Sequence, residues 1–103
     1  MNFFVAGTDT GVGKTVVTAL LAKQSQDLGL SVVTQKWVQS GDLHRPDLVI
    51  HDDLGGLDLS LTPELAACRS PYSFSYPASP HLASEMEGVT IQADRIKQAY
   101  QTL

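Results

Sequence analysis

A glycine-rich run between two apolar segments is the feature that most constrains how this chain folds. Residues 7–15 read Gly-Thr-Asp-Thr-Gly-Val-Gly-Lys-Thr, after the apolar run 3–6 and before the apolar segment 16–21. This order predicts a buried strand at about residues 2–6, then a glycine turn, then the start of a helix. Because glycine tolerates backbone angles that a Cβ forbids, such a turn lets backbone N–H groups approach phosphate oxygens closely.

The side chains that end the glycine run suit a nucleoside triphosphate. Lys14 can place an ammonium on the outer phosphates, and the Thr15 hydroxyl can bind Mg²⁺, while the helix start adds N–H donors and a positive dipole end. The residues expected to bind ATP are Gly11, Val12, Gly13, Lys14, Thr15 and Val16. Five residues separate Gly7 from Gly13 where the common motif has four. The alternative is therefore an ordinary strand-to-helix turn with a solvated lysine.

The rest of the chain alternates between helix and strand patterns. Apolar runs and turn residues predict a helix over about 14–28 with Gly29 at its C-cap, a strand over 31–38 and a loop over 39–46. A short helix is expected from Asp47 until Gly55-Gly56 ends it, and a helical turn from Thr62-Pro63-Glu64. An ordered loop over 70–80 and a helix over about 91–103 follow. Two strands separated by such a helix indicate a parallel unit. The predicted fold class is α/β, a P-loop NTPase-type parallel sheet with flanking helices, incomplete at this length. We expect residues 1–103 to be the N-terminal part of one nucleotide-binding domain, truncated in its last helix.

Composition narrows the possible partners. The net charge of −4 and the scattered lysines and arginines argue against a nucleic acid or an anionic membrane. Cys68 is the single cysteine, so a disulfide framework is excluded and a reducing compartment is favoured. No apolar stretch approaches membrane-spanning length. We therefore expect a soluble, cytoplasmic protein. His44, His51 and His81 lack the mutual spacing of a metal site.

Four further residues are candidates for the chemistry. Lys36 is expected at the carboxyl end of the second strand, the edge where ligands bind in open α/β sheets. A second cation there would neutralise charge on a transferred phosphoryl group, although a solvated rim lysine is the alternative. Ser40 and Gly41 could bind a substrate or form an ordinary turn. Asp47 could cap its helix or complete a Mg²⁺ shell with Thr15.

Three motifs in sequence order carry a resemblance. They are Gly7-Thr-Asp-Thr-Gly-Val-Gly-Lys-Thr15 with its five-residue spacer, Lys36 with Ser40-Gly41, and Pro71-Tyr-Ser-Phe74 followed by Pro77-Ala-Ser-Pro-His81. They resemble the phosphate loop, the Lys-Pro-Val-x-Ser-Gly signature and the Pro-Tyr-x-Phe and Pro-x-Ser-Pro-His segments of dethiobiotin synthetase, the ATP-dependent ligase of biotin synthesis. Trp37 stands where this signature has proline.

The resemblance implies that 7,8-diaminononanoate, CO₂ and ATP give dethiobiotin, ADP and phosphate. One amine captures CO₂ as a carbamate, ATP phosphorylates the carbamate, and the second amine closes the ureido ring. By position, residues 11–16 would wrap the ATP phosphates, Lys14 and Lys36 would be the catalytic cations, and Ser40 would contact the amine or carbamate end of the substrate. Thr15 and Asp47 would bind Mg²⁺, and Asp47 would also belong to the nucleotide site.

Some assignments within the resemblance stay open. Asp53 is the alternative to Asp47 as the metal ligand, because it has a more even spacing from Ser40. The resemblance covers the N-terminal half of a family whose full-length members are expected to be homodimers. It lacks that family's Glu-Gly-Ala-Gly-Gly-type strand end, so activity of the 103 residues alone is in question.

Two other functions compete with a ligase. One is a switch-type P-loop ATPase that binds nucleotide to bias an interaction, but Thr8 and Asp9 stand where many such proteins carry an extra lysine. The other is a non-catalytic nucleotide-binding or regulatory domain. ATP turnover that depends on diaminononanoate would support the ligase. Basal ATP turnover alone would support the switch, and the absence of both would support the non-catalytic domain.

Overall fold

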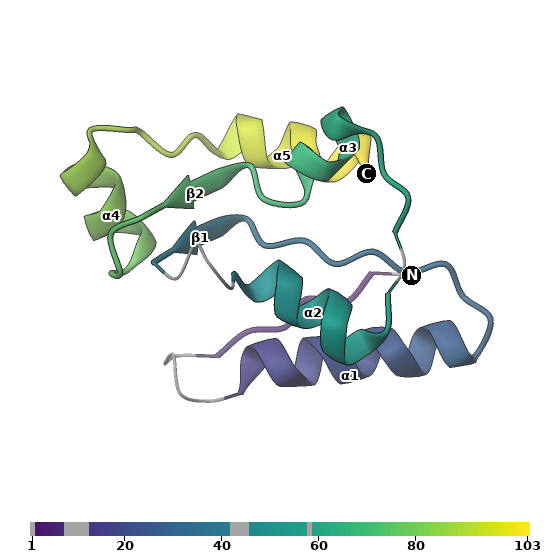
Figure 1. Cartoon of the computed structure of the whole chain (residues 1–103). Coiled ribbons are helices and arrows are strands. Elements are labelled where there is room, and N and C mark those ends of the chain that lie inside the picture. Colours follow the sequence, from purple (N-terminus) through teal and green to yellow (C-terminus); the bar gives the residue numbers. More distant parts are fainter. Residues whose placement is uncertain (1, 8–12, 42–45, 58) are drawn as a thin grey trace. The chain divides into compact units, whose positions relative to one another are not determined.

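The structure is a computed structural model that describes residues 2–7, 13–41, 46–57 and 59–103 (Figure 1). Its elements are α1 (Lys14–Asp27), β1 (Val38–Ser40), α2 (Asp47–Gly55), α3 (Pro63–Cys68), β2 (Tyr72–Phe74), α4 (Pro80–Glu87) and α5 (Ala93–Thr102). They belong to two compact units. One consists of Met1–Thr34 with Val49–Leu59, and the other of Gln35–Leu48 with Ser60–Leu103.

Four helices begin or end close to the predicted residues. Gly29 has a φ of +85° just beyond the Leu28 cap of α1, and α2 runs from Asp47 to Gly55 before Gly56, whose φ is +63°. Thr62 caps α3 by accepting a hydrogen bond from the Leu65 N–H, with proline in the first helical turn. The predictions of α1, α2, α3 and α5 are therefore confirmed.

The predicted strands are wrong. Among the described residues the sheet has two parallel strands, β1 and β2, which pair Val38 with Tyr72 and Ser40 with Phe74. Residues 2–7 lie outside any described helix or strand, and β1 takes only the last residue of the predicted strand 31–38. A strand exists only through its backbone partners. The apolar runs did not identify these partners.

The parallel sheet with flanking helices agrees with the predicted fold class. β2 lies in the segment 70–80, which was predicted to be an ordered loop. Tyr72 and Phe74 are buried while Ser73 between them is exposed, the alternation of a half-buried strand. α4 was not predicted, although Ser79 caps it and Gly88 follows it with a φ of +68°.

The core of the second unit lies where β1 and β2 meet α4 and α5 (Figure 1). Tyr72, Phe74 and Ala83 are buried together, and the Tyr72 hydroxyl accepts a hydrogen bond from the Gln92 N–H at 3.0 Å, which joins β2 to the start of α5. Of the aromatic side chains in this unit, Tyr72 and Phe74 pack in the core, whereas Trp37 and Tyr76 are exposed.

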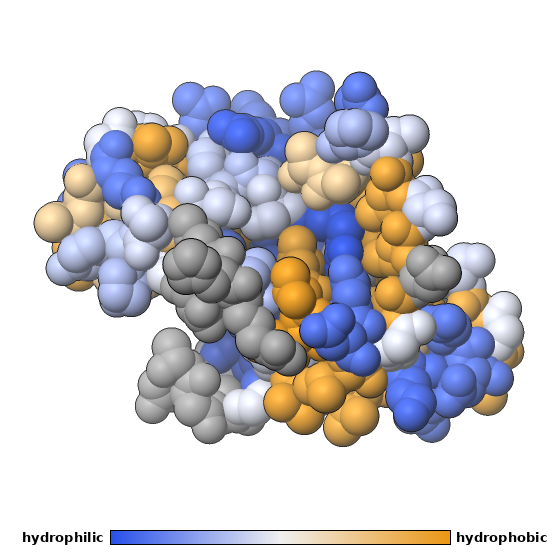
Figure 2. Space-filling view, viewed as in Figure 1, coloured by the Kyte–Doolittle hydropathy of each residue, from blue (hydrophilic) through white to orange (hydrophobic). Residues whose placement is uncertain are grey.

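The first unit packs α2 against α1 through small residues. Ala19 and Ala22 of α1 are buried, and a Cβ added to Gly55 of α2 would lie 3.1 Å from the Ala19 carbonyl oxygen. His51 Nδ1 lies 2.9 Å from Thr34 Oγ1, and both side chains are buried. Four large apolar side chains of α1 are exposed, namely Val16, Val17, Leu20 and Leu21. Figure 2 shows hydrophobic surface at the lower edge, where Figure 1 draws α1.

No helix in the described ranges combines the length and the apolar character that crossing a membrane requires.

Candidate functional site

The glycine run ends at a left-handed glycine. Gly13 has a φ of +80° and caps α1, and a Cβ built on it would meet nothing within 4 Å. Its carbonyl accepts the Val17 N–H at 3.0 Å, so the helix ladder starts at this residue. Because a glycine cap brings no side chain to the first N–H groups, the end of α1 suits an anion. Gly11 and Val12, the first residues of the predicted cradle, lie outside the described residues.

Lys14 joins the two ends of the glycine run. Its ammonium Nζ donates to the Gly7 carbonyl oxygen at 3.4 Å. Lys14 and Thr15 are the first two residues of α1 and are half-buried, whereas Val16 is exposed. A lysine bonded to Gly7 keeps its charge near the start of α1, where phosphate oxygens are expected.

A lysine and a carboxylate form a second cluster, in the other unit. Lys36 Nζ and Asp47 Oδ2 make an ion pair, with side chains 33% and 24% exposed. Asp47 is the first residue of α2, where a negative charge favours the helix dipole. Lys36 lies two residues before β1 rather than at a carboxyl strand end, so the predicted placement on the strand is wrong because the strand begins later.

Gln39 is a residue of this cluster that sequence reasoning missed. It is buried in β1, its Oε1 accepts the Asp47 N–H at 3.2 Å, and its Nε2 donates to the Gly41 carbonyl at 3.2 Å. The sequence carries no signal for this role, because residue 39 falls in the predicted loop 39–46 and its partners are backbone groups.

The carboxyl end of β1 brings together the second and third sequence motifs. Ser40 Oγ donates to the Ala78 carbonyl oxygen at 2.6 Å, and the Gly41 N–H donates to the Phe74 carbonyl oxygen at 2.8 Å. Gly41 has a φ of +66°, and a Cβ added to it would lie 2.8 Å from Pro77 Cβ. Motifs more than 30 residues apart in sequence therefore share one strand end.

A metal site is not complete in the described part of the chain. Over those residues there is no group of three or more histidine, cysteine or acidic side chains that could hold a metal ion. Thr15 and Asp47 belong to different units, and Asp53 is exposed on α2. The pairing of Thr15 with Asp47 or Asp53 around Mg²⁺ thus remains a prediction.

The histidines and Cys68 take other roles. His51 contacts Thr34, and His81 Nε2 lies 3.1 Å from Glu85 Oε1 on the exposed face of α4. His44 lies outside the described residues. Cys68 is a free, half-buried thiol.

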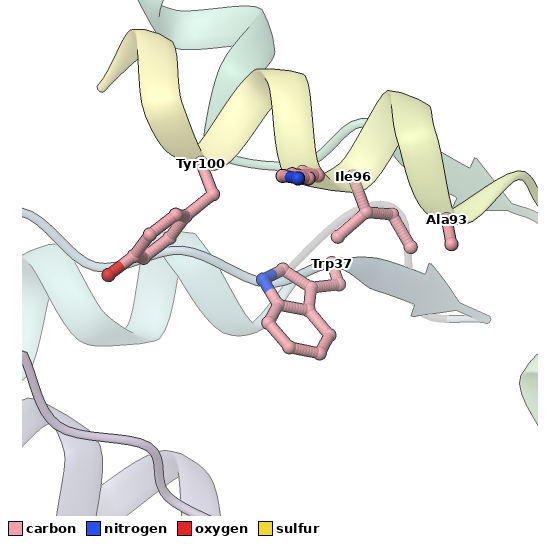
Figure 3. Close-up of a pocket in the computed structure, with 5 residues that line it drawn as sticks. Trp37, Ala93, Ile96 and Tyr100 are labelled. Atoms are coloured by element: carbon pink, nitrogen blue, oxygen red, sulfur yellow. The ribbon is translucent and has the colours of Figure 1, made fainter.

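An open pocket of about 360 Å³ lies beside α5 (Figure 3). Its lining is Trp37, Ala93, Ile96, Lys97 and Tyr100. Figure 3 shows the Trp37 ring facing Ile96 and the Tyr100 ring extending from the far end of the helix. No residue of the predicted site lines this pocket.

The glycine run and the parallel sheet define a P-loop α/β protein, and comparison with known families gives the same class. The family model described as an AAA domain matches residues 1–103. The chain belongs to this AAA-domain family.

Relatives of this chain carry a more specific name than that of the AAA-domain family. This chain is 44% identical over 97 residues to ATP-dependent dethiobiotin synthetase BioD 2 of Haemophilus ducreyi, covering 93% of the chain and 46% of that relative. It is 41% identical over 97 residues to the BioD 2 protein of Haemophilus influenzae, covering 93% and 50%. It is 42% identical over 96 residues to BioD of Chlorobaculum tepidum, covering 92% and 40%.

These matches confirm the resemblance to dethiobiotin synthetase seen in the three motifs. They also agree with its extent, because the chain spans about half the length of the curated relatives it matches.

Proposed function

We propose that this chain is the nucleotide-binding part of an ATP-dependent dethiobiotin synthetase, a cyclo-ligase of biotin synthesis. The substrates would be 7,8-diaminononanoate, CO₂ and ATP with Mg²⁺, and the product would carry a new ureido ring. The proposal includes a cytoplasmic location and a homodimeric complete enzyme, without a nucleic-acid or membrane partner. The observation that carries it is the contact of Ser40-Gly41 with Phe74 and with 77–78, which joins two motifs of the family at one strand end.

The glycine run would hold the phosphates of ATP. Gly13 has a left-handed backbone and open surroundings that suit a phosphate cradle, and the Lys14 ammonium donates to the Gly7 carbonyl oxygen. The Thr15 hydroxyl is an oxygen ligand of the type that Mg²⁺ prefers. Bound ATP supplies the phosphoryl group, and the contribution of the protein is to position it and to balance its charge.

Ser40 would receive the amine end of the substrate. Its hydroxyl hydrogen is directed to the Ala78 carbonyl, so the oxygen is left to accept a hydrogen bond. An amine or ammonium group is a donor and therefore matches this oxygen. A carbamate oxygen, which can only accept, matches the Lys36 cation better than it matches Ser40.

Lys36 and Asp47 would work as a charge pair. Lys36 would balance negative charge on the carbamate and on the transferring phosphoryl group, and Asp47 would be a Mg²⁺ ligand. In the structure each neutralises the other. Either role therefore requires a new partner of opposite charge to compete with the existing one.

The nucleotide part of the proposal is tested by calorimetry of ATP binding with Mg²⁺. Lys14→Ala removes a charge-assisted contact of about 1.5–3 kcal/mol, so affinity should fall by about one to two orders of magnitude. Lys23→Ala is the matched control, because Lys23 is an exposed lysine on the same helix and should leave affinity unchanged. Equal affinity in the wild-type and Lys14→Ala chains would refute the phosphate-cradle assignment.

A further inference from the structure

The Gln39 side chain makes three hydrogen bonds to backbone groups around the end of β1. Its side chain is 6% exposed, and it lies between Val38 and Ser40 in the middle of β1. The amide Nε2 donates to the carbonyl oxygens of Ser40 at 3.3 Å and of Gly41 at 3.2 Å, and Oε1 accepts the Asp47 N–H at 3.2 Å. Both ends of the amide are thus bonded to backbone.

The chemistry of these partners fixes which way the amide points. Carbonyl oxygens only accept and a backbone N–H only donates, so only one orientation of the Gln39 amide satisfies all three. A leucine would fill a similar volume and would leave the buried Gly41 carbonyl, and the part-buried Ser40 carbonyl and Asp47 N–H, without this partner. Leaving such groups unpaired is the costly part of losing a buried hydrogen bond.

The three bonds link the two ends of the connection from β1 to α2. Gly41 follows the last residue of β1, and Asp47 is the first residue of α2. Holding the Asp47 N–H fixes the backbone from which its carboxylate projects toward Lys36. Holding the Ser40 carbonyl fixes the residue whose hydroxyl donates to Ala78.

We propose that Gln39 is a positioning residue, whose buried amide fixes Asp47 against Lys36 and sets the backbone of Ser40. It acts through these side chains and does not itself contact a substrate. The structural part of this inference stands on the three hydrogen bonds alone. Its consequence for Mg²⁺ binding rests on the proposed function, because that assigns Asp47 as a metal ligand.

The first test is amide hydrogen exchange of the chain followed by NMR. In the wild-type chain the Asp47 amide should exchange much more slowly than an unprotected amide. Gln39→Leu should speed Asp47 exchange by at least about tenfold, because the acceptor is gone. The Gly41 amide, which donates to Phe74 across the sheet, should stay protected and shows that the sheet remains folded.

A second variant separates hydrogen bonding from packing. Gln39→Met keeps the unbranched shape of the side chain without the amide, so Asp47 exchange should become fast as in Gln39→Leu. Gln98→Leu makes the Gln39→Leu change at an exposed position of α5 and should alter neither amide. Fast Asp47 exchange in the wild-type chain would overturn the proposal without any variant, and so would Asp47 exchange that Gln39→Leu leaves unchanged.

The second test measures the Mg²⁺ dependence of ATP binding. Residues that orient a metal ligand commonly change metal affinity by about 10–100-fold, so Gln39→Leu should weaken the Mg²⁺ effect by about that factor and leave metal-free ATP affinity unaltered. If Gln39→Leu speeds Asp47 exchange but leaves the Mg²⁺ effect unchanged, the positioning role of Gln39 stands and Asp47 is not a metal ligand. A loss of ATP affinity in the absence of metal would contradict the proposed path through Asp47.

Discussion

Lys36 and Asp47, two charged residues of the proposed site, form a half-buried ion pair. A partner removed from such a pair leaves the other charge partly desolvated. The ion pair also holds the Lys36 ammonium at one position beside Asp47. This geometry favours a positioned cation over a mobile rim lysine, because a rim lysine gains little from a fixed partner.

Lys36→Gln tests this residue in a complete enzyme that contains residues 1–103. If Lys36 stabilises the transferring phosphoryl group, turnover should fall by at least about 100-fold while the KM for ATP changes little. Lys97→Gln is the control, because Lys97 is an exposed lysine of the same unit outside the predicted site. Normal turnover in Lys36→Gln would show that Lys36 is a solvated rim lysine and does not stabilise the phosphoryl group.

Sequence reasoning reached the residue types of the site but not their contacts. Lys36 and Ser40 were singled out from a motif and Asp47 from its place at a predicted helix start, and the structure brings Lys36 and Asp47 together. Their ion pair spans eleven residues and depends on where β1 ends and α2 begins. Gln39 was missed because a glutamine carries no signature until its backbone partners are in place.

At the scale of elements, helices and strands differed in how well they could be predicted. The helix ends carry local signals, such as Thr62 before Pro63 in α3 and glycine after α1. The strands depend on partners far away in the sequence. Phe3 and Phe4, which suggested a buried strand, are 68% and 73% exposed, whereas Tyr72 and Phe74 form the core strand inside a proline-rich segment.

Gly41 is the residue on which the end of β1 most depends. Its left-handed backbone costs a residue with a Cβ about 1–2 kcal/mol, and the Cβ would also overlap Pro77. Forcing Pro77 away adds about 1–3 kcal/mol, so Gly41→Ala should lower the free energy of unfolding by roughly 2–5 kcal/mol in total. Urea unfolding followed by circular dichroism measures the change.

Gly88→Ala is the matched control for this prediction. Gly88 has a φ of +68°, close to that of Gly41, and a Cβ on it would meet nothing within 4 Å. Its substitution should therefore cost only the backbone term, about 1–2 kcal/mol. If Gly41→Ala and Gly88→Ala lower the free energy of unfolding equally, the Cβ contact with Pro77 does not contribute to the cost.

The whole molecule leaves much of its apolar surface uncovered. No side chain of the described residues is both large and fully buried, and the exposed apolar side chains include four on α1. Large apolar surface of this kind favours association with other apolar surfaces. The buried core is correspondingly small, formed around Tyr72, Phe74 and Ala83.

We therefore expect the purified 103-residue chain to bind a hydrophobic dye strongly and to self-associate as its concentration rises. Light scattering coupled to gel filtration gives the mass, and dye fluorescence reports the exposed surface. Replacing Leu20 and Val17 on α1 with glutamate should reduce both signals, since these side chains are exposed in the monomer. A monodisperse monomer with weak dye binding would contradict this expectation.

The most direct test of the central claim is dethiobiotin formation by a hybrid enzyme. Residues 1–103 would replace the matching part of the Haemophilus ducreyi synthetase, whose sequence they match over 97 residues. With ATP, Mg²⁺, CO₂ and 7,8-diaminononanoate, the account predicts ADP release that requires the diamine and yields dethiobiotin by mass spectrometry. The same hybrid with Lys14→Ala should lose this activity. A folded hybrid that hydrolyses ATP without requiring the diamine, or forms no dethiobiotin, would contradict the account.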